Sequence, residues 1–556
     1  MSRRRFLKTT LTATAGAVLG GRGVVSASPA FDLVIRGGTV VDGTGAPAYA
    51  ADVAVTGDAI AAVGSISAEQ GRRVLDATGF HVCPGFIDIH THSDRTILEY
   101  PTADSRVRQG VTTELAGNCG SSAAPLGGVG IEDRKKEYRD DGVTPDWTSV
   151  ASYLARLERT GVSINQALLL GQGTLRENAI GNVDRVLAPE ELAAVLRTVE
   201  QGMEEGAFGI STGLEYTPGR YTPTDEIVAM ARVAARYGGL YASHIRNEEK
   251  TLLEAVDEAI AIGRRSGARV EVSHLKASGR SNWGKQRAAL DLIESARRDG
   301  VAVLADAYPY TAYSTGLSIM LPAWAREGRN ADVVRRLRDP EARGRIRKEV
   351  IAQIADELGE YDLIVISSVK TAGNRPLVGK NMVEIGAGWR IEPVDAILRL
   401  LEEEDASVGF IGHGMSPENV EMVLRHPLVM IGSDGSSMAP VGKAAESRPH
   451  PRSYGAFARV LGHYRRERAL FDLPAAVRKM TSMPADQIGL RDRGRLARGA
   501  KADIVVFDAA QVKDEATFVD PHRYPAGIRD VVVNGTLVVE AGAHTGARPG
   551  RGLRRG

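Results

Sequence analysis

Short apolar runs alternate with helical stretches over most of this chain, and this alternation constrains the fold more than any other feature. The segment 189–206, for example, repeats apolar residues with the helical period, and β-branched runs flank it. Alternating strands and helices are typical of βα units built around a parallel sheet. Eight strands close a TIM-type barrel, and eight candidate strands end at His92, Gly117, Gly171, Leu214, Ile245, Lys276, Tyr310 and Asp434. We therefore predict an α/β chain with a TIM-type (β/α)8 barrel.

The two ends of the chain differ from the middle, because both consist of short strand-like runs separated by Gly and Asp turns. We expect residues 31–83 and 485–545 to pair into one small β-sandwich domain, with the barrel at 84–484. The gap before the eighth strand predicts an insertion over the barrel mouth at about 314–427. The basic, Gly-rich tail 546–556 is expected to be disordered.

The first 30 residues have the pattern of an export signal. Arg3, Arg4 and Arg5 precede an apolar run of small residues, which predicts a cleavable signal peptide of the twin-arginine type and a periplasmic or extracellular location. An amphipathic first helix is the alternative. Beyond this segment, no stretch is apolar for long enough to span a membrane.

Composition points to a small-molecule partner. Lys plus Arg minus Asp plus Glu is 70 − 69 = +1, and removing residues 1–27 would leave 65 − 69 = −4. This balance gives no electrostatic case for binding nucleic acid. Cys83 and Cys119 are the two cysteines. Two cysteines do not make a disulfide framework, although one bridge is possible. The sequence leaves the oligomeric state open.

Several potential metal ligands stand at or just past the ends of different candidate strands. In a strand, His90 and His92 would share a face. Taken singly, a histidine is more often a core or loop residue, and an Asp in the segment SDGSS is often a turn former. Their joint occurrence is hard to explain by packing, and the mixed donors suit zinc rather than magnesium or calcium. The six candidate ligands are His90, His92, Cys119, His244, His274 and Asp434.

The order of these residues and several short motifs resemble the N-acyl-D-amino-acid deacylase (D-aminoacylase) family of amidohydrolases. The motifs are GNCG around Cys119, STGLEYTPG at 211–219, the SHLK run and the HPR segment 450–452. The resemblance covers about residues 31–545. Many dihydropyrimidinase-like relatives carry a carboxylated lysine near the fourth strand, and the corresponding segment here, FGISTGLEY, has no lysine.

The resemblance implies one tight zinc ion and a second position that is weaker or empty. The tight site would be formed by Cys119, His244 and His274, and the second position by His90, His92 and Asp434. Asp434 would also act as the catalytic acid and base, taking a proton from water and passing it to the leaving amine. Glu215 is a further candidate for the metal shell.

The same resemblance assigns the α-carboxylate of the substrate to Arg452, assisted by Lys276 and Tyr308. A guanidinium can hold a carboxylate through two bonds, although an arginine in an irregular, Pro-rich stretch can equally be an exposed surface residue. Tyr216 is expected to line the acyl or side-chain pocket. The apolar segment 318–324 favours hydrophobic substrates over acidic ones.

Together these features predict zinc-dependent hydrolysis of N-acyl-D-amino acids to a carboxylate and a free D-amino acid. The first alternative is a cyclic amide hydrolase of the hydantoin or dihydropyrimidine type, or a D-dipeptide hydrolase, with the same zinc. The second is a non-enzymatic scaffold, which we disfavour because no ligand position is missing.

Overall fold

The computed structural model describes residues 30–556, and its centre is a ring of eight parallel strand positions, the third of them split in two. The predicted export signal lies outside these residues, except for its last position. Each strand hydrogen-bonds to the next in chain order. The barrel strands are β8 (Phe86–Asp88), β9 (Val111–Ala116), β10 (Asn165–Leu168) with β11 (Leu170–Gly171), β12 (Gly209–Gly213), β13 (Leu240–His244), β14 (Arg269–Val272), β15 (Val303–Ala307) and β19 (Val429–Ile431).

The ring closes where the segments that follow β8 and β19 meet. The backbone N–H of Asp434 donates to the carbonyl of His90 at 2.8 Å, and that of His92 donates to the carbonyl of Gly435 at 2.9 Å. These bonds join the first and last strands at their carboxyl ends. The predicted TIM-type barrel is confirmed, and the closure itself brings together three of the candidate ligands.

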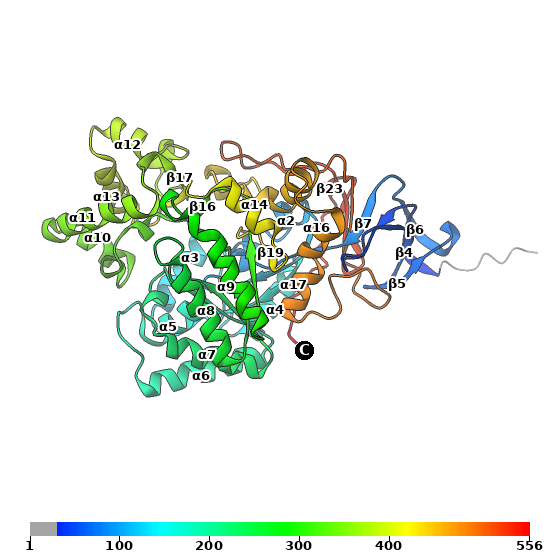
Figure 1. The fold of residues 1–556 in the computed structure, drawn as a ribbon, viewed down its shortest axis with the longest axis horizontal. Helices are drawn as coiled ribbons and strands as arrows, with labels where there is room; N and C mark the ends of the chain where they lie inside the picture. The colour runs from blue at the N-terminus through cyan, green and yellow to red at the C-terminus, as the bar shows by residue number, and fades with distance from the viewer. Residues whose placement is uncertain (1–29) are drawn as a thin grey trace, which may run out of the picture.

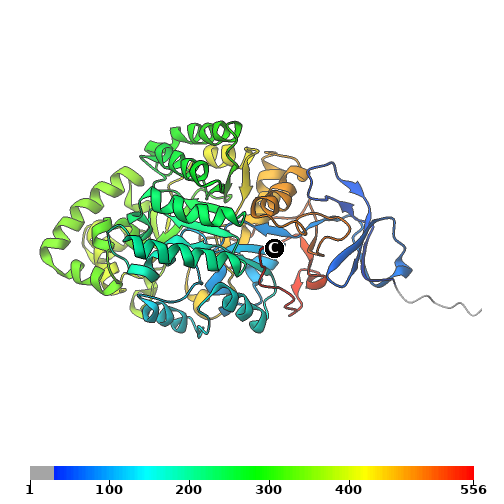
Figure 2. The same ribbon diagram turned by 90° about the horizontal axis from the view of Figure 1, so that it is seen from below.

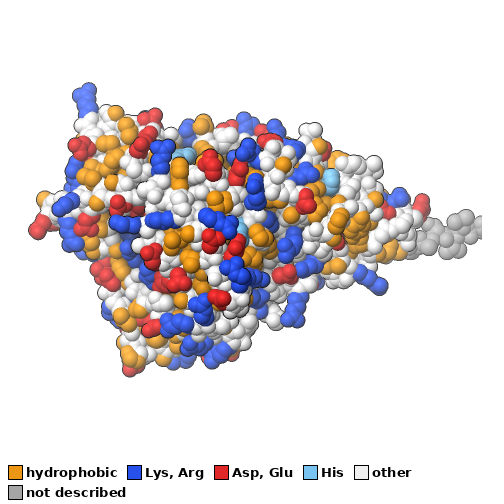
Figure 3. Space-filling view, viewed as in Figure 1, with side chains coloured by type: hydrophobic (Ala, Val, Ile, Leu, Met, Phe, Trp, Pro, Cys, Tyr) orange, Lys and Arg blue, Asp and Glu red, His pale blue; other side chains and the backbone are white. Residues whose placement is uncertain are grey.

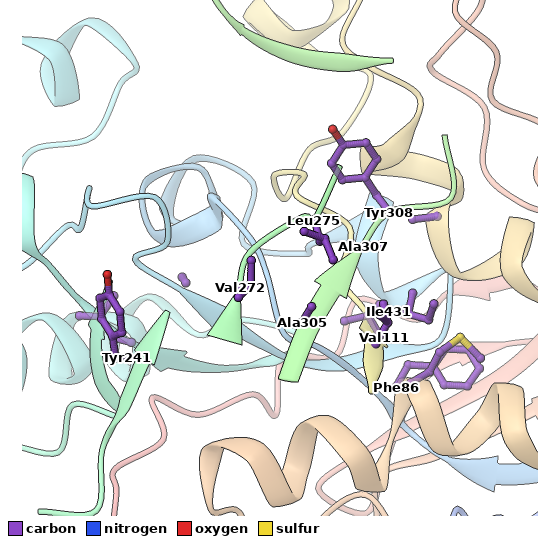
Figure 4. Packing of buried hydrophobic residues seen from close by; sticks show 14 of the residues in the cluster. Phe86, Val111, Tyr241, Val272, Leu275, Ala305, Ala307, Tyr308 and Ile431 are labelled. Atoms are coloured by element: carbon purple, nitrogen blue, oxygen red, sulfur yellow. The ribbon is translucent and has the colours of Figure 1, made fainter. Parts of the chain in front are cut away.

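Alternation along the strands divides apolar side chains between the barrel interior and the helix layer. Ile87, Leu304 and Met430 belong to the cluster that fills the ring. Their neighbours, including Ala305 and Ile431, belong to the larger cluster between the strands and the outer helices (Figure 4). Burial on both faces explains why the strands read as continuous apolar runs in the sequence.

The outer helices begin and end where local chemistry favours it. At the start of α6 (Pro189–Glu204) the Glu191 carboxylate accepts the backbone N–H of Ala188 at 2.8 Å, and Pro189 occupies the first turn. At the end of α8 (Leu252–Ser266), Gly267 adopts a left-handed conformation with φ 80°. The outer layer includes α4 (Val150–Thr160), α5 (Gln172–Ile180), α6 (Pro189–Glu204), α7 (Thr224–Arg236), α8 (Leu252–Ser266), α9 (Gln286–Arg298), α14 (Pro417–Arg425) and α16 (Leu473–Met480) (Figure 1).

Two further sheets lie beside the barrel, and one of them combines strands from both ends of the chain. The two pack around a shared apolar cluster that includes Ile35, Val53 and Ile504. One sheet contains β5 (Ala59–Gly64), β4 (Asp52–Thr56), β1 (Phe31–Arg36) and β6 (Gly71–Asp76); the other contains β23 (Ala543–His544), β22 (Thr536–Glu540), β21 (Ile528–Val533), β20 (Ile504–Phe507), β7 (His81–Pro84), β2 (Thr39–Val40) and β3 (Tyr49–Ala50).

The insertion forms a separate lobe with its own apolar core, at the end of the molecule opposite the sandwich sheets (Figures 1 and 2). It ends earlier than the expected 427, because α14 and the segment before it belong to the barrel. Its elements are β16 (Tyr313–Gly316), α10 (Asn330–Arg338), α11 (Pro340–Glu357), β17 (Ile364–Ser368), α12 (Met382–Trp389), α13 (Pro393–Glu403) and β18 (Gly409–Gly412).

The C-terminal tail is ordered, and the prediction that residues 546–556 are disordered is wrong. The backbone N–H of Gly550 donates to the Val162 carbonyl at 2.8 Å, and that of Leu553 donates to Gln166 at 2.8 Å. The Arg555 guanidinium donates to the Tyr237 carbonyl at 2.8 Å. Composition suggested a solvated segment, whereas these backbone and guanidinium donors find carbonyls along the barrel.

On the face shown in Figure 3, Lys and Arg side chains are mixed with Asp and Glu. Among the helices of residues 30–556, none is both long and apolar enough to cross a membrane.

Candidate active site

All six candidate metal ligands lie just beyond or at the carboxyl ends of the barrel strands, and their donor atoms form two adjoining groups. The sulfur of Cys119 belongs to both. The first group is Cys119, His244 and His274, and the second is His90, His92, Cys119 and Asp434. From the sequence, Cys119 was expected in the first group alone.

Three of these ligands have an uncommon backbone conformation. Cys119, His274 and Asp434 have φ values of 50°, 35° and 52°, in the left-handed region that is uncommon for residues other than glycine. Hydrogen bonds hold two of them, because the N–H of His274 donates to Asp306 Oδ1 at 3.0 Å and that of Asp434 to the carbonyl of His90. Such outliers cluster at functional sites, where the surrounding structure compensates for their cost.

The strand ends correct one part of the sequence analysis. β8 ends at Asp88 and β14 at Val272, so His90, His92 and His274 lie in the following loops rather than on a strand face. Their imidazoles converge because the loops are fixed by the closing hydrogen bonds and by Asp306.

The spacing in the first group fits a zinc ion. Zn–S bonds of about 2.3 Å and Zn–N bonds of about 2.0 Å place the donors of a tetrahedral site roughly 3.3–3.6 Å apart. Cys119 Sγ lies 3.4 Å from His274 Nε2, within this range. The 2.9 Å between His244 Nδ1 and His274 Nε2 is shorter than that range. The donor set of one thiolate and two imidazoles is nevertheless one that zinc prefers over hard cations.

The second group has similar dimensions around an acidic residue. Cys119 Sγ lies 3.4 Å from His90 Nε2, which lies 3.6 Å from Asp434 Oδ1. His92 Nε2 is 2.9 Å from the same carboxylate oxygen. These residues could hold a second ion that shares Cys119 with the first.

Three carboxylates face the imidazole nitrogens that point away from the metal groups. Asp306 Oδ2 lies 3.2 Å from His90 Nδ1, and Glu248 Oε1 lies 2.9 Å from His274 Nδ1. Glu215 Oε2 lies 3.3 Å from His244 Nε2. An acid on the outer nitrogen is the usual support of a metal-bound histidine.

Sequence reasoning missed Asp306 and Glu248 and treated Glu215 as a ligand. The available signal was position, because Glu215 and Glu248 follow β12 and β13, and Asp306 is the residue before the end of β15. Glu215, which lies on the outer nitrogen of His244, orients the ligand in this structure.

Opposing effects set the charge states of Cys119 and Asp434. Burial raises the pKa of the Cys119 thiol, but the neighbouring His90 and His274 outweigh it and hold that pKa well below its usual value. Burial likewise raises the pKa of Asp434, but Arg452 together with His92, His274 and His90 holds it well below its usual value, so the carboxyl stays ionised. Both groups are thus held in the forms that bind a metal cation.

Two cations stand beside the metal groups in the wall of a cavity of about 380 Å³. Arg452 Nη1 donates to Asp434 Oδ2 at 2.7 Å and Nη2 donates to the Ser314 carbonyl at 3.2 Å. Lys276 Nζ donates to Glu248 Oε1 at 2.6 Å. Burial lowers the pKa of Lys276, and Glu248 reverses this and raises it. Arg452 is therefore a buried residue of the cavity and not an exposed surface arginine.

The two predicted tyrosines take different positions. Tyr216 lines the cavity, and its ring centroid lies 4.7 Å from that of His244. Tyr308 lies behind the cations, with the Arg452 guanidinium 5.1 Å and the Lys276 ammonium 5.7 Å from its ring centroid. Its hydroxyl donates to Met415 Sδ at 3.7 Å and does not line the main cavity. Tyr308 thus supports the cations from behind.

His450 of the HPR segment has a structural role next to Arg452. Its Nε2 donates to the Ala312 carbonyl at 2.8 Å, and its Nδ1 accepts the backbone N–H of Arg452 at 3.0 Å. The histidine thereby fixes the backbone from which the guanidinium enters the cavity.

A barrel with converging imidazole, thiolate and carboxylate donors at its carboxyl face defines a metal-dependent hydrolase. A family model described as "Amidohydrolase family" matches residues 73–539. An N-acyl-D-glutamate deacylase from Alcaligenes xylosoxydans xylosoxydans is 39% identical over 525 residues, covering 94% of this chain and 97% of the relative. A D-aminoacylase from the same organism is 37% identical, covering 95% and 99%.

Solved structures give the same result. The N-acyl-D-glutamate deacylase of Bordetella bronchiseptica, complexed with zinc and a phosphonate mimic of the tetrahedral intermediate, has a TM-score of 0.80 and 36% identity, covering 94% of this chain and 99% of that one. A D-aminoacylase studied for its binuclear metal centre has a TM-score of 0.79 and 35% identity, covering 94% and 100%. The chain therefore belongs to the amidohydrolase family, in its D-aminoacylase branch. The expected membership of the D-aminoacylase family is confirmed.

Proposed function

We propose that the protein hydrolyses N-acyl-D-amino acids to a carboxylate and a free D-amino acid. The observation that carries the proposal is the placement of Arg452 and Lys276 in one cavity with the Cys119, His244 and His274 group. A substrate with an amide and an α-carboxylate would present both groups to this cavity at once. The D-aminoacylase and N-acyl-D-glutamate deacylase relatives support this choice of substrate.

Recognition of the α-carboxylate would fall to Arg452. Its guanidinium is buried, lies over the Tyr308 ring and points to the metal groups. A planar fork of N–H donors suits a carboxylate better than a point charge does. Lys276 adds positive charge on the neighbouring wall, so the clamp would fix the amide relative to the ligands.

Asp434 would carry the proton. Zinc, when bound, polarises the amide carbonyl and makes a water molecule more acidic. The Asp434 carboxylate is ionised and within 3.6 Å of both His90 and His92 nitrogens, so it can accept a proton at the mouth of the site. It would then return this proton to the leaving amine nitrogen.

We further propose one tight zinc at Cys119, His244 and His274, and a second, weaker position at His90, His92 and Asp434. Support for the tight site comes from its donor types. The first group offers one thiolate and two imidazoles, which are soft or borderline donors that suit zinc. In the second group Asp434 is also paired with Arg452, which competes with a metal for its charge.

The decisive assay uses zinc-loaded protein and paired D and L N-acetyl derivatives of methionine, leucine and lysine, with chiral analysis of the products. We expect hydrolysis of D substrates only. Exclusive turnover of L substrates would overturn the proposal. Faster turnover of hydantoins or D-dipeptides would instead favour a cyclic amide or dipeptide hydrolase.

The expected preference for hydrophobic side chains has a narrow structural basis. Of the segment 318–324, Ile319 lines the cavity, whereas Met320 and Leu321 pack into the core of the insertion. The apolar side chains of this segment therefore serve mainly the core of the insertion rather than the cavity.

Export by the twin-arginine route is also proposed, on the sequence of residues 1–30 alone. A reporter fused to these residues should reach the periplasm, and replacement of Arg4 and Arg5 by Lys should stop it.

A further inference from the structure

One end of the cavity is lined by carboxylates from three different elements. Glu215 follows β12, Glu249 follows β13, and Glu357 is the last residue of α11 in the insertion. The two cations of the cavity lie on the side of the metal ligands, where each already pairs with an acid. The cavity wall thus holds paired cations at the metal groups, and carboxylates without a Lys or Arg partner in residues 30–556 where the insertion meets the barrel.

Glu249 is buried and incompletely satisfied. Glu249 is only 7% exposed. Oε2 accepts from Asn247 Nδ2 at 2.8 Å and from the Glu248 N–H at 3.2 Å. Oε1 accepts no hydrogen bond from any residue of 30–556, and no Lys or Arg of that range lies within ion-pair distance of Glu249 or Glu357. Buried carboxylates are normally paired with a cation.

The crowding of these acids shifts the pKa values of two of them. Burial, together with Glu215 and Glu357, raises the pKa of Glu249 well above its usual value. Burial and Glu215 raise the pKa of Glu357 to about 8. Arg326 of the insertion donates Nη1 to the backbone carbonyl of Glu215 at 3.2 Å rather than to a carboxylate. Within the described chain, no Lys or Arg forms an ion pair with Glu249 or Glu357, although Lys276 lowers the pKa of Glu249 and Arg326 and Arg220 lower that of Glu357 from a greater distance.

We propose that the acidic end formed by Glu215, Glu249 and Glu357 binds a cationic group at the end of the substrate side chain. The favoured substrates would be N-acyl derivatives of D-lysine or D-arginine. This inference rests on the proposed deacylase function. An ammonium or guanidinium would pair with the free Oε1 of Glu249 and relieve the repulsion between the acids. An acidic side chain, as in N-acyl-D-glutamate, would gain no such pairing.

The test compares substrates of nearly equal shape and different charge on the zinc-loaded enzyme. N-acetyl-D-lysine is paired with N-acetyl-D-norleucine, which lacks the ammonium, and N-acetyl-D-arginine with the neutral N-acetyl-D-citrulline. We expect kcat/KM to favour the cationic member of each pair by about tenfold or more, the size of one net buried ionic contact.

The outcomes separate this inference from the function on which it rests. Hydrolysis of norleucine and citrulline derivatives with equal or higher kcat/KM would overturn the cationic preference and leave deacylation intact. No turnover of any D substrate would overturn both. A preference for N-glycyl-D-norleucine over N-acetyl-D-lysine would place the cation on the acyl group and overturn the side-chain assignment.

Three variants and one control localise the effect. Glu249→Gln and Glu357→Gln keep the side-chain shape, and each should reduce the lysine to norleucine ratio of kcat/KM at least threefold. Glu360→Gln is the control, because Glu360 is exposed on the same lobe and does not line the cavity. Glu357→Lys should raise kcat/KM for N-acetyl-D-glutamate above the wild-type value. An unchanged ratio in both Gln variants would overturn the assignment.

Discussion

Arg452 and Asp434 form a buried ion pair, with Nη1 of the guanidinium 2.7 Å from Oδ2 of the carboxylate. The group proposed to clamp the substrate thus contacts the group proposed to carry the proton. Nη2 donates a separate hydrogen bond to the Ser314 carbonyl. Replacement of the Arg452 guanidinium by the ammonium of a lysine should therefore disturb both substrate binding and the position of Asp434.

We accordingly predict that Arg452→Lys raises KM for the best N-acetyl-D-amino acid about tenfold or more, since Lys cannot make the paired contacts of the guanidinium. Steady-state kinetics on zinc-loaded protein measures this. Arg448→Lys, at an exposed position in the same loop, should behave as wild type. An unaltered KM in Arg452→Lys would argue against the clamp.

Asp434→Asn should lower kcat by about 10²–10⁴-fold, because the amide preserves the shape but cannot accept the proton. Zinc content is measured in parallel, since Asp434 also belongs to the second metal group. Near-normal kcat in a variant that retains its zinc would assign the proton transfer to another residue.

The two cysteines offer a matched test of the metal site. Cys119→Ala should lose most of its bound zinc, because this sulfur belongs to both donor groups. Cys83→Ala should keep it, because Cys83 is buried in the core at β7. Metal analysis after dialysis gives the comparison. Full zinc occupancy in Cys119→Ala would contradict the shared-ligand arrangement.

Asp306 contacts two ligands at once, through the His90 ring and the His274 backbone. We predict that Asp306→Asn weakens zinc affinity by roughly 10–100-fold, the usual cost of removing an acid behind a metal-bound histidine. Competition with a fluorescent zinc chelator measures the affinity. Asp299→Asn, at an exposed position after α9, is the control. Equal affinities in the two variants would show that Asp306 has no positioning role.

The sequence predicted the barrel and the ligand types because both follow from local patterns. Eight apolar runs indicate strands, and donor residues after them converge once the strands close into a ring. It could not predict the left-handed backbone of His274, since this depends on Asp306 from the next strand. The position of Tyr308 behind the cations and the docking of Leu553 on Gln166 likewise depend on packing between distant segments.

The acidic end of the cavity should also give the folded protein a distinct dependence on pH. Burial and Glu215 raise the pKa of Glu357 from 4.5 to about 8. The folded state therefore holds a proton on Glu357 that the unfolded state releases between these values. The stability contributed by this proton is complete below about pH 4.5 and is lost as the pH rises through about 8.

Glu357→Gln is uncharged at every pH and should not show this loss. The melting temperature of the variant minus that of the wild type should consequently increase from pH 5 to pH 8 and level off above it. Thermal unfolding of both zinc-loaded proteins at fixed ionic strength measures the difference, with Glu360→Gln as the control. A difference that stays constant over this pH range would mean that Glu357 is already ionised in the folded protein, with a counter-ion that the carboxylate cluster does not contain.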